Sequence, residues 1–192
     1  MRKITLTDIR SLPEYEAMRD GLRRHIIDIK KRRRLSVGDR VSLVFENRDT
    51  VLYQIQEMVR AEHITSPEGI RDEIDVYNRS VPEDGEMSAT MLIELTERGQ
   101  IRAEMDRLIG INEHVRLRIG SEHMIPGVFE PGWSREDRVA AVQYVKFPLT
   151  PAQREAFRSG QEPVFIEVNH PSYQAAAELD QGVRETLAGD LG

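Results

Sequence analysis

The stretch at residues 45–64, FENRDTVLYQIQEMVRAEHI, contains the residue types best suited to chemistry in this chain. If it is a helix, Glu57, Arg60 and His63 follow one another at steps of three, so neighbouring side chains can contact each other. An acid and a histidine can work as a general acid/base pair, and an arginine can hold an anionic substrate through two hydrogen bonds. The stretch therefore predicts a candidate polar cleft formed by Glu57, Arg60 and His63.

Glu46 extends this candidate site from the end of the preceding segment. Glu46, Glu57 and His63 together offer the oxygen and nitrogen ligands that suit a non-haem iron, manganese or zinc ion. Gln54 and Gln56 add uncharged hydrogen-bonding groups, as a helix that lines a polar cleft does. The spacing matches no recognised metal motif, and the alternative interpretation is an exposed ladder of salt bridges. Both interpretations remain open on the sequence alone.

His170, in the sequence NHPSY, is a second-rank candidate. The proline that follows holds His170 in an extended conformation, at the end of a predicted strand. Catalytic and binding residues are common at such positions. The alternative is a turn in which Asn169 or Ser172 caps a following helix.

The run KKRRR, from Lys30 to Arg34, is the strongest concentration of charge. It can bind phosphate, nucleic acid or an acidic protein surface. It can also end a helix, where cations meet the negative end of the helix dipole. Because the whole chain has a net charge of −6 and the run contains no aromatic residue, nucleic-acid binding is the least favoured of these functions.

The candidate cleft depends on a strand and a helix that are neighbours in the chain. Residues 41–46 alternate so that Val41, Leu43 and Phe45 share one face of a strand. Residues 50–64 contain an apolar stripe typical of a helix that packs on a sheet. We therefore expect the polar cleft to lie between strand 41–46 and helix 50–64.

The remaining elements predict the fold class. Further helices are predicted over residues 11–34, 66–77, 97–110 and 150–160, and from 172 to near the end. Ser11 with Glu14 indicates the start of the first of these helices, and Leu22 and Ile26 lie on its apolar side. Thr150 before Pro151 indicates the start of helix 150–160, and Asn47 and Asp49 are expected to cap helix 50–64. Further strands are predicted over residues 88–95, 139–147 and 163–169, and in a hairpin over 114–125. Because strands and helices do not alternate regularly, we expect an α+β fold. It would be a single domain over residues 1–192, with a largely antiparallel sheet of about six strands and about six helices packed around it.

The hairpin carries the most specific turn prediction. The Gly120-Ser121 pair suits a two-residue type II′ turn. With that turn, alternate residues face the core, namely Val115, Leu117, Ile119 and Met124. The opposite face would then present His114, Arg116, Arg118 and His123, a set that can bind an anion or remain solvated.

Composition excludes several classes of protein. The chain of 192 residues contains 39% hydrophobic and 31% charged residues, which is typical of a folded and rather polar protein. No apolar run approaches the roughly 20 residues of a membrane helix, so we expect no membrane insertion. The first residues lack the apolar centre of a signal peptide, which predicts a cytoplasmic protein. Cysteine is absent, which excludes disulfides, thiol catalysis and iron–sulfur clusters held by cysteine.

The segment GDRVSLVFENRDTVLYQIQEMVRAEHI, the pair YN at Tyr77, the triplet SAT at Ser88 and the late NHPSY resemble an uncharacterised bacterial family, the domain of unknown function numbered 3501. The pattern covers nearly the whole chain. The family has no assigned activity, so the resemblance implies no catalytic residue. Its members are often encoded near a rubrerythrin-like diiron protein and an iron–sulfur oxidoreductase similar to heterodisulfide reductase subunits. This context implies a role in redox or peroxide handling.

Two hypotheses from different classes follow. The first is an accessory or binding component of a redox or oxidative-stress system, with a rubrerythrin-like protein or an iron–sulfur oxidoreductase as its partner. The alternative is a metal-dependent or acid/base enzyme, with Glu46 and Glu57 as bases or ligands, His63 as proton shuttle or ligand, and Arg60 as anion clamp. The sequence leaves a homo-oligomer open.

Overall fold

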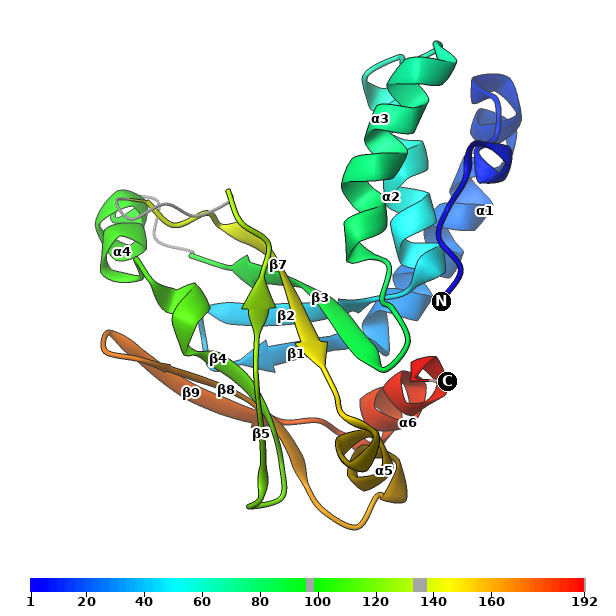
Figure 1. The fold of residues 1–192 in the computed structure, drawn as a ribbon. Helices are drawn as coiled ribbons and strands as arrows, with labels where there is room; N and C mark the ends of the chain where they lie inside the picture. Colours follow the sequence, from blue (N-terminus) through cyan, green and yellow to red (C-terminus); the bar gives the residue numbers. More distant parts are fainter. Residues whose placement is uncertain (96–98, 133–137, 192) are drawn as a thin grey trace.

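The computed structural model describes residues 1–95, 99–132 and 138–191, and this part of the chain contains nine β-strands and six α-helices (Figure 1). The strands are β1 (Arg34–Val37), β2 (Val41–Glu46), β3 (Glu86–Ile93), β4 (Val115–Ile119), β5 (His123–Pro126), β6 (Val128–Phe129), β7 (Val142–Pro148), β8 (Val164–His170) and β9 (Tyr173–Glu178). The helices are α1 (Leu12–Lys31), α2 (Arg48–Ala61), α3 (Pro67–Tyr77), α4 (Ile101–Arg107), α5 (Pro151–Ser159) and α6 (Gln181–Asp190). The predicted α+β class is confirmed.

The strands form two antiparallel sheets rather than the one sheet expected from the sequence. One sheet has the order β1-β2-β3-β7-β6 and the other the order β5-β4-β8-β9. Alternate residues of both sheets point into one shared hydrophobic cluster, which includes Phe45, Met91, Leu117 and Ile166. Because the side chains of a strand alternate between its two faces, the other residues of each sheet face away from this cluster.

Helices α5 and α6 extend the cluster between the sheets. Phe157 of α5 and Val183 and Leu187 of α6 belong to it. Arg184 holds the two helices together, because its guanidinium donates hydrogen bonds to the carbonyl of Phe157 at 2.6 and 2.8 Å and also to that of Glu162. These bonds satisfy carbonyls at and beyond the C-terminal end of α5, which lack partners within the helix.

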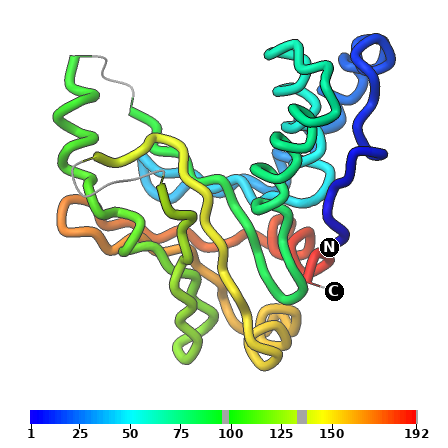
Figure 2. The backbone as a smooth tube through the Cα atoms, turned by 45° about the horizontal axis from the view of Figure 1, so that its top comes forward, coloured from blue at the N-terminus to red at the C-terminus, as the bar shows by residue number. Residues whose placement is uncertain are grey.

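Helices α1, α2 and α3 stand together beyond one end of the strands (Figure 1). We call these three helices, with residues 1–10, the helical arm. The helical arm has a hydrophobic cluster of its own, formed by Ile4, Val51, Ile55, Val59 and Ile74, and Val81, shortly after α3, also belongs to it. The apolar stripe predicted for helix 50–64 supplies three of these residues. The first and last described residues lie close together at the base of the helical arm in both views (Figures 1 and 2).

Several local predictions are confirmed. Ser11 and Glu14 form the capping box that starts α1. Of the two expected caps of α2, Asn47 is the cap, because its side chain accepts a hydrogen bond from the Thr50 backbone N–H at 2.9 Å. Asp49 lies within the first turn of the helix and does not cap it. Thr150 caps α5. Local capping chemistry therefore determined where these helices begin.

The helix predicted from residue 172 to near the end is wrong in its first part. Residues 173–178 form β9, which pairs with β8 from His170 opposite Tyr173 to Phe165 opposite Glu178. The last helix, α6, begins only after Asp180, whose side chain accepts a hydrogen bond from the Val183 N–H at 2.8 Å. The backbone groups along the edge of β8 pair with this segment and override the helix propensity of its alanines.

The predicted two-residue turn of the hairpin is also wrong. Ile119 pairs with His123, so the turn contains three residues rather than Gly120 and Ser121 alone. One additional residue moves every side chain of β5 to the opposite face. As a result Ile125 is buried, whereas Met124 is 44% exposed.

The turn between β1 and β2 leaves no room for a side chain at Gly38. Its φ is +70°, and the Tyr173 hydroxyl, which donates to the Val37 carbonyl at 2.5 Å, occupies the place of a Cβ atom. We expect Gly38→Ala to lower the free energy of unfolding by about 1–3 kcal/mol in urea denaturation. Gly21→Ala, in α1 with open space around it, should instead raise it by up to about 1 kcal/mol. Equal effects of the two substitutions would contradict this account.

Within the described residues, no helix combines the length and the apolar character needed to cross a membrane.

Candidate functional site

Glu57 of α2 faces α1, not the strand that precedes α2. Its carboxylate accepts a hydrogen bond from the Tyr15 hydroxyl at 2.7 Å and two from Arg19, through Nε and Nη2, at 2.8 Å each. Arg60 adds a guanidinium nitrogen 3.4 Å away. The hydrogen bonds from Arg19 and Tyr15 and the positive charges of Arg19 and Arg60 lower the pKa of Glu57 to about 2. The carboxylate is therefore a weak base at neutral pH and joins α1 to α2.

His63 and Arg60 lie at the end of α2. His63 is exposed and adopts the left-handed conformation, with φ of 52°. Its N–H donates to the Arg60 carbonyl at 3.3 Å, and the Ile64 N–H donates to the Val59 carbonyl at 2.9 Å. This is the Schellman arrangement that ends a helix. The position of His63 is thus accounted for by helix termination.

Glu46 occupies a different environment, at the start of α2. It is 3% exposed, and its carboxylate accepts hydrogen bonds from the hydroxyls of Thr50 and, at 2.7 Å, Thr90. The positive end of the α2 dipole also favours a carboxylate here. Glu57 lies about 14 Å along the helix axis from Arg48, the first residue of α2, at about 1.5 Å per residue.

The structure therefore does not bring Glu46, Glu57 and His63 to one point. Among the described residues, no group of three or more histidine, aspartate or glutamate side chains is placed to hold a metal ion. Iron, manganese or zinc binding stays a prediction, and the geometry gives it no location.

His170 is buried in the turn between β8 and β9. Its Nδ1 accepts a hydrogen bond from the Ser172 N–H at 3.2 Å, and its Nε2 lies 3.0 Å from the Ile109 carbonyl, to which it donates as the Nε2–H tautomer. The ring also meets His114 edge-on, with 5.2 Å between centroids. Both ring nitrogens are used by the backbone, so the geometry favours a turn over a site. The expected helix cap at Asn169 or Ser172 is wrong, because the strand β9 follows the turn and Asp180 caps the next helix.

The basic run does not form one continuous cationic surface. Arg33 is 4% exposed and pairs with Asp190 of α6 at 2.6 Å. Arg34 pairs with Glu94 at 2.6 Å. The chain's own carboxylates thus neutralise part of the run, which favours a structural role.

A cavity of about 280 Å³ lies inside the helical arm, between α1, α2 and the N-terminal segment. Its floor is apolar and aromatic and consists of Tyr15, Leu22, Ile26, Leu52 and Tyr53. Its rim is polar and consists of Asp8, Arg10, His25 and Asp49, and the buried Gln56 adds a polar group to the wall. We take this cavity as the candidate functional site, because an apolar body with a few polar groups is typical of small-molecule pockets.

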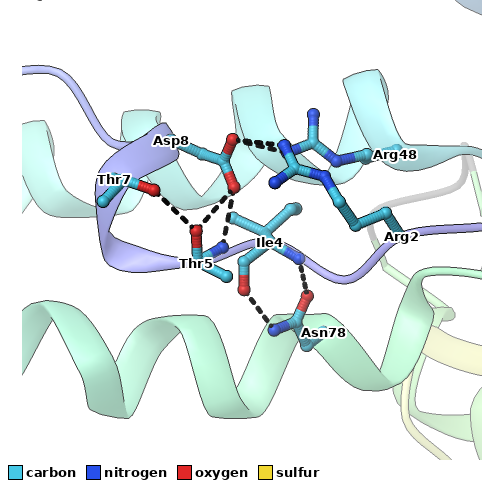
Figure 3. A network of polar contacts seen from close by, with 7 residues as sticks. All are labelled: Arg2, Ile4, Thr5, Thr7, Asp8, Arg48 and Asn78. Atoms are coloured by element: carbon cyan, nitrogen blue, oxygen red, sulfur yellow. Dashed lines mark hydrogen bonds and ion pairs between the residues drawn. The ribbon is translucent and has the colours of Figure 1, made fainter.

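Hydrogen bonds and ion pairs hold the N-terminal segment in place at the rim (Figure 3). The side chain of Asn78 pairs with the backbone of Ile4, accepting from its N–H and donating to its carbonyl, both at 2.8 Å. Asp8 accepts a hydrogen bond from the Thr5 N–H at 2.8 Å and pairs with Arg48 of α2 at 2.6 Å. The hydrogen bond from the Thr5 backbone, with help from Arg48, lowers the pKa of Asp8 well below its ordinary value. The segment is therefore attached to both α2 and α3.

Gln56 fixes the backbone of Arg10. The amide of Gln56, which is 4% exposed, accepts from the Arg10 N–H at 2.9 Å and donates to the Arg10 carbonyl at 3.1 Å. The Gln56 amide thus satisfies the backbone N–H and carbonyl of Arg10, which have no partner in a neighbouring strand. The Arg10 side chain remains exposed at the rim of the cavity.

The electrostatics of the cavity differ between floor and rim. Burial, followed by the nearby Glu57 carboxylate, raises the pKa of Tyr15 and of Tyr53, so both phenols stay protonated. At the rim, the side chains of Arg10, His25 and Asp49 form no hydrogen bond or ion pair with any other described residue. These three side chains are therefore available to a ligand.

The sequence predicted only part of this site. It placed Leu22 and Ile26 on the apolar side of α1 and marked Gln56 as an unusual polar residue. It did not identify Arg10, His25 or Asp49 as neighbours, because they come from three separate segments.

Comparisons with known proteins place the chain among proteins without an assigned function. A family model described as "Protein of unknown function (DUF3501)" matches residues 3–191. A crystal structure described as a novel protein of unknown function from Burkholderia pseudomallei K96243 is 34% identical to the chain, with a TM-score of 0.93 over 100% of both chains. The search of curated proteins found no match.

Proposed function

The chain belongs to the DUF3501 family of proteins of unknown function, and we propose that it is a binding protein that holds a small molecule in the cavity between α1 and α2. One observation carries the proposal: an apolar floor is combined with a rim on which Arg10, His25 and Asp49 are unpaired among the described residues. The volume of about 280 Å³ is near the lower end of the roughly 300–1,000 Å³ of small-molecule pockets. A small ligand is therefore expected.

The walls of the cavity are held before any ligand binds. Glu57 joins α1 to α2 through Tyr15 and Arg19, and Gln56 fixes the N-terminal segment at Arg10. A pocket that is already ordered loses less conformational entropy on binding. This rigidity supports a recognition site rather than a gap between mobile helices.

Filling the cavity should abolish binding. We expect Leu22→Trp to remove the signals of small molecules that bind the unchanged protein in a ligand-observed NMR screen, because the indole would occupy the apolar floor. Ile27→Trp is the matched control, since Ile27 lies on the same helix, is 41% exposed and does not line the cavity. Circular dichroism checks that both variants fold.

Two results of this screen would contradict the proposed function. One is that the ligands bind Leu22→Trp and Ile27→Trp equally well, because binding would then take place elsewhere. The other is that no compound binds the unchanged protein at millimolar concentration.

The proposal includes the accessory role that the resemblance implied. The chain contains no cysteine, so a contribution to thiol or iron–sulfur redox chemistry would pass through a partner or a bound molecule. Support for this part comes only from the gene neighbourhood that the family resemblance implies. Co-purification with the rubrerythrin-like protein or the iron–sulfur oxidoreductase at low salt tests it, and an empty result would count against the redox role without affecting the cavity.

A further inference from the structure

Two opposite charges share the rim of the cavity without pairing. Arg10 belongs to the N-terminal segment, and Asp49 belongs to the first turn of α2. They form no ion pair with each other, although both line the same cavity. Unpaired opposite charges at one pocket are complementary to a ligand that carries both charges.

The other charged groups nearby are already engaged. Asp8 pairs with Arg48 at 2.6 Å and with Arg2 at 2.9 Å, so its charge is compensated within the chain. Glu57 is held by Arg19. Glu14 interacts electrostatically with Arg10 without forming an ion pair, and its carboxylate accepts hydrogen bonds from Ser11. Arg10 and Asp49 are therefore the cation and the anion of the rim that form no ion pair among the described residues, with a ring nitrogen of His25 as an additional polar group.

The floor determines the rest of the ligand. Leu22, Ile26 and Leu52 and the rings of the two tyrosines present apolar surface. Burying an apolar group of the ligand on such a surface favours binding, because it removes apolar area from water. A charged or strongly polar body would lose its hydration there without compensation.

We propose that the cavity recognises a small zwitterion, a molecule with the charge pattern of a free α-amino acid and a large apolar side chain. This inference rests on the proposed binding function and specifies its ligand class. The Arg10 guanidinium binds the carboxylate of the ligand through two hydrogen bonds, Asp49 binds its ammonium group, and the side chain enters the apolar floor.

Three compounds that share one apolar group but differ in their charges separate the contributions of the carboxylate and the ammonium group to binding. L-Phenylalanine carries both charges, 3-phenylpropionate carries the carboxylate alone, and phenethylamine carries the ammonium alone. We expect L-phenylalanine to bind at least tenfold more tightly than either of the other two in calorimetric titrations. Leu22→Trp should abolish all three interactions, and Ile27→Trp should preserve them.

Charge-removing variants assign each contact. Arg10→Gln should weaken the binding of L-phenylalanine and of 3-phenylpropionate about tenfold and leave the binding of phenethylamine unchanged. Asp49→Asn should weaken the binding of L-phenylalanine and of phenethylamine and leave the binding of 3-phenylpropionate unchanged. The matched controls are Arg24→Gln and Asp20→Asn, which change exposed residues of α1 that do not line the cavity.

The outcomes distinguish the two proposals. If a singly charged probe binds as tightly as L-phenylalanine, and Leu22→Trp abolishes its binding, the zwitterion inference is overturned and the cavity remains a binding site. If none of the three probes binds while other compounds of the screen depend on Leu22, the ligand class is again wrong. If binding of all three persists in Leu22→Trp, the cavity is not the site, and both proposals fail.

Discussion

Arg33→Met is expected to lower the free energy of unfolding by about 3–5 kcal/mol, the usual cost of breaking a buried ion pair. Arg33 is 4% exposed, and its Nη1 lies 2.6 Å from the Asp190 carboxylate in α6. Without the guanidinium, Asp190 remains as a partly buried carboxylate with no counter-ion. Urea denaturation of the variant and the unchanged protein measures the difference.

Two further variants make this expectation specific. Arg32→Met changes an exposed neighbour in the same run and should alter the free energy of unfolding by less than about 0.5 kcal/mol. The double variant Arg33→Met with Asp190→Leu should recover part of the loss, because it leaves no unpaired charge. Equal costs for Arg32→Met and Arg33→Met would show that the buried pair does not connect the end of α1 to α6.

Glu57→Gln should lower the free energy of unfolding at pH 7 by about 2 kcal/mol, because it removes charged hydrogen bonds to Arg19 and Tyr15. The expected pH dependence follows from the lowered pKa, which is about 2 in the folded chain against an ordinary value of 4.5. A carboxyl whose folded pKa is lowered contributes its full stabilisation above the ordinary value and loses it as the pH falls toward the folded value.

The difference between Glu57→Gln and the unchanged protein should therefore be largest above pH 4.5 and shrink between pH 4.5 and about 2. Urea denaturation at several pH values measures this difference. Glu62→Gln, which changes an exposed acid at the end of α2, should show neither the loss nor the pH dependence. A constant difference across this pH range would mean that Glu57 does not join the two helices through its charge.

The sequence predicted those elements whose signals are local. The alternation in residues 41–46 and the caps Ser11, Asn47 and Thr150 lie within a few residues of the structure that they determine. The hairpin register was missed because it depends on one residue of turn length, and β9 was missed because its partner β8 decides its conformation. Non-local pairing overrode local propensity in that case.

The candidate cleft shows the same limit. Glu46, Glu57 and His63 look like neighbours along the chain, yet their contacts lie in different places. Glu46 contacts Thr90 of β3 and Thr50 at the start of α2, Glu57 contacts α1, and His63 contacts the C-terminal end of α2. The rim residues of the cavity come from three segments instead. A single sequence does not show that such distant segments lie close together. The one local signal was the polar Gln56 on α2, which contacts the N-terminal segment.

The separate hydrophobic cluster of the helical arm has a consequence for how the protein unfolds. That cluster shares no residue with the one between the sheets. Because the free energy of a local opening depends on the contacts that are lost, the helical arm can open as a cooperative unit while the two sheets stay closed. Occupancy of the cavity would then slow amide hydrogen exchange in α1 and α2 and leave exchange in β4 and β8 unchanged.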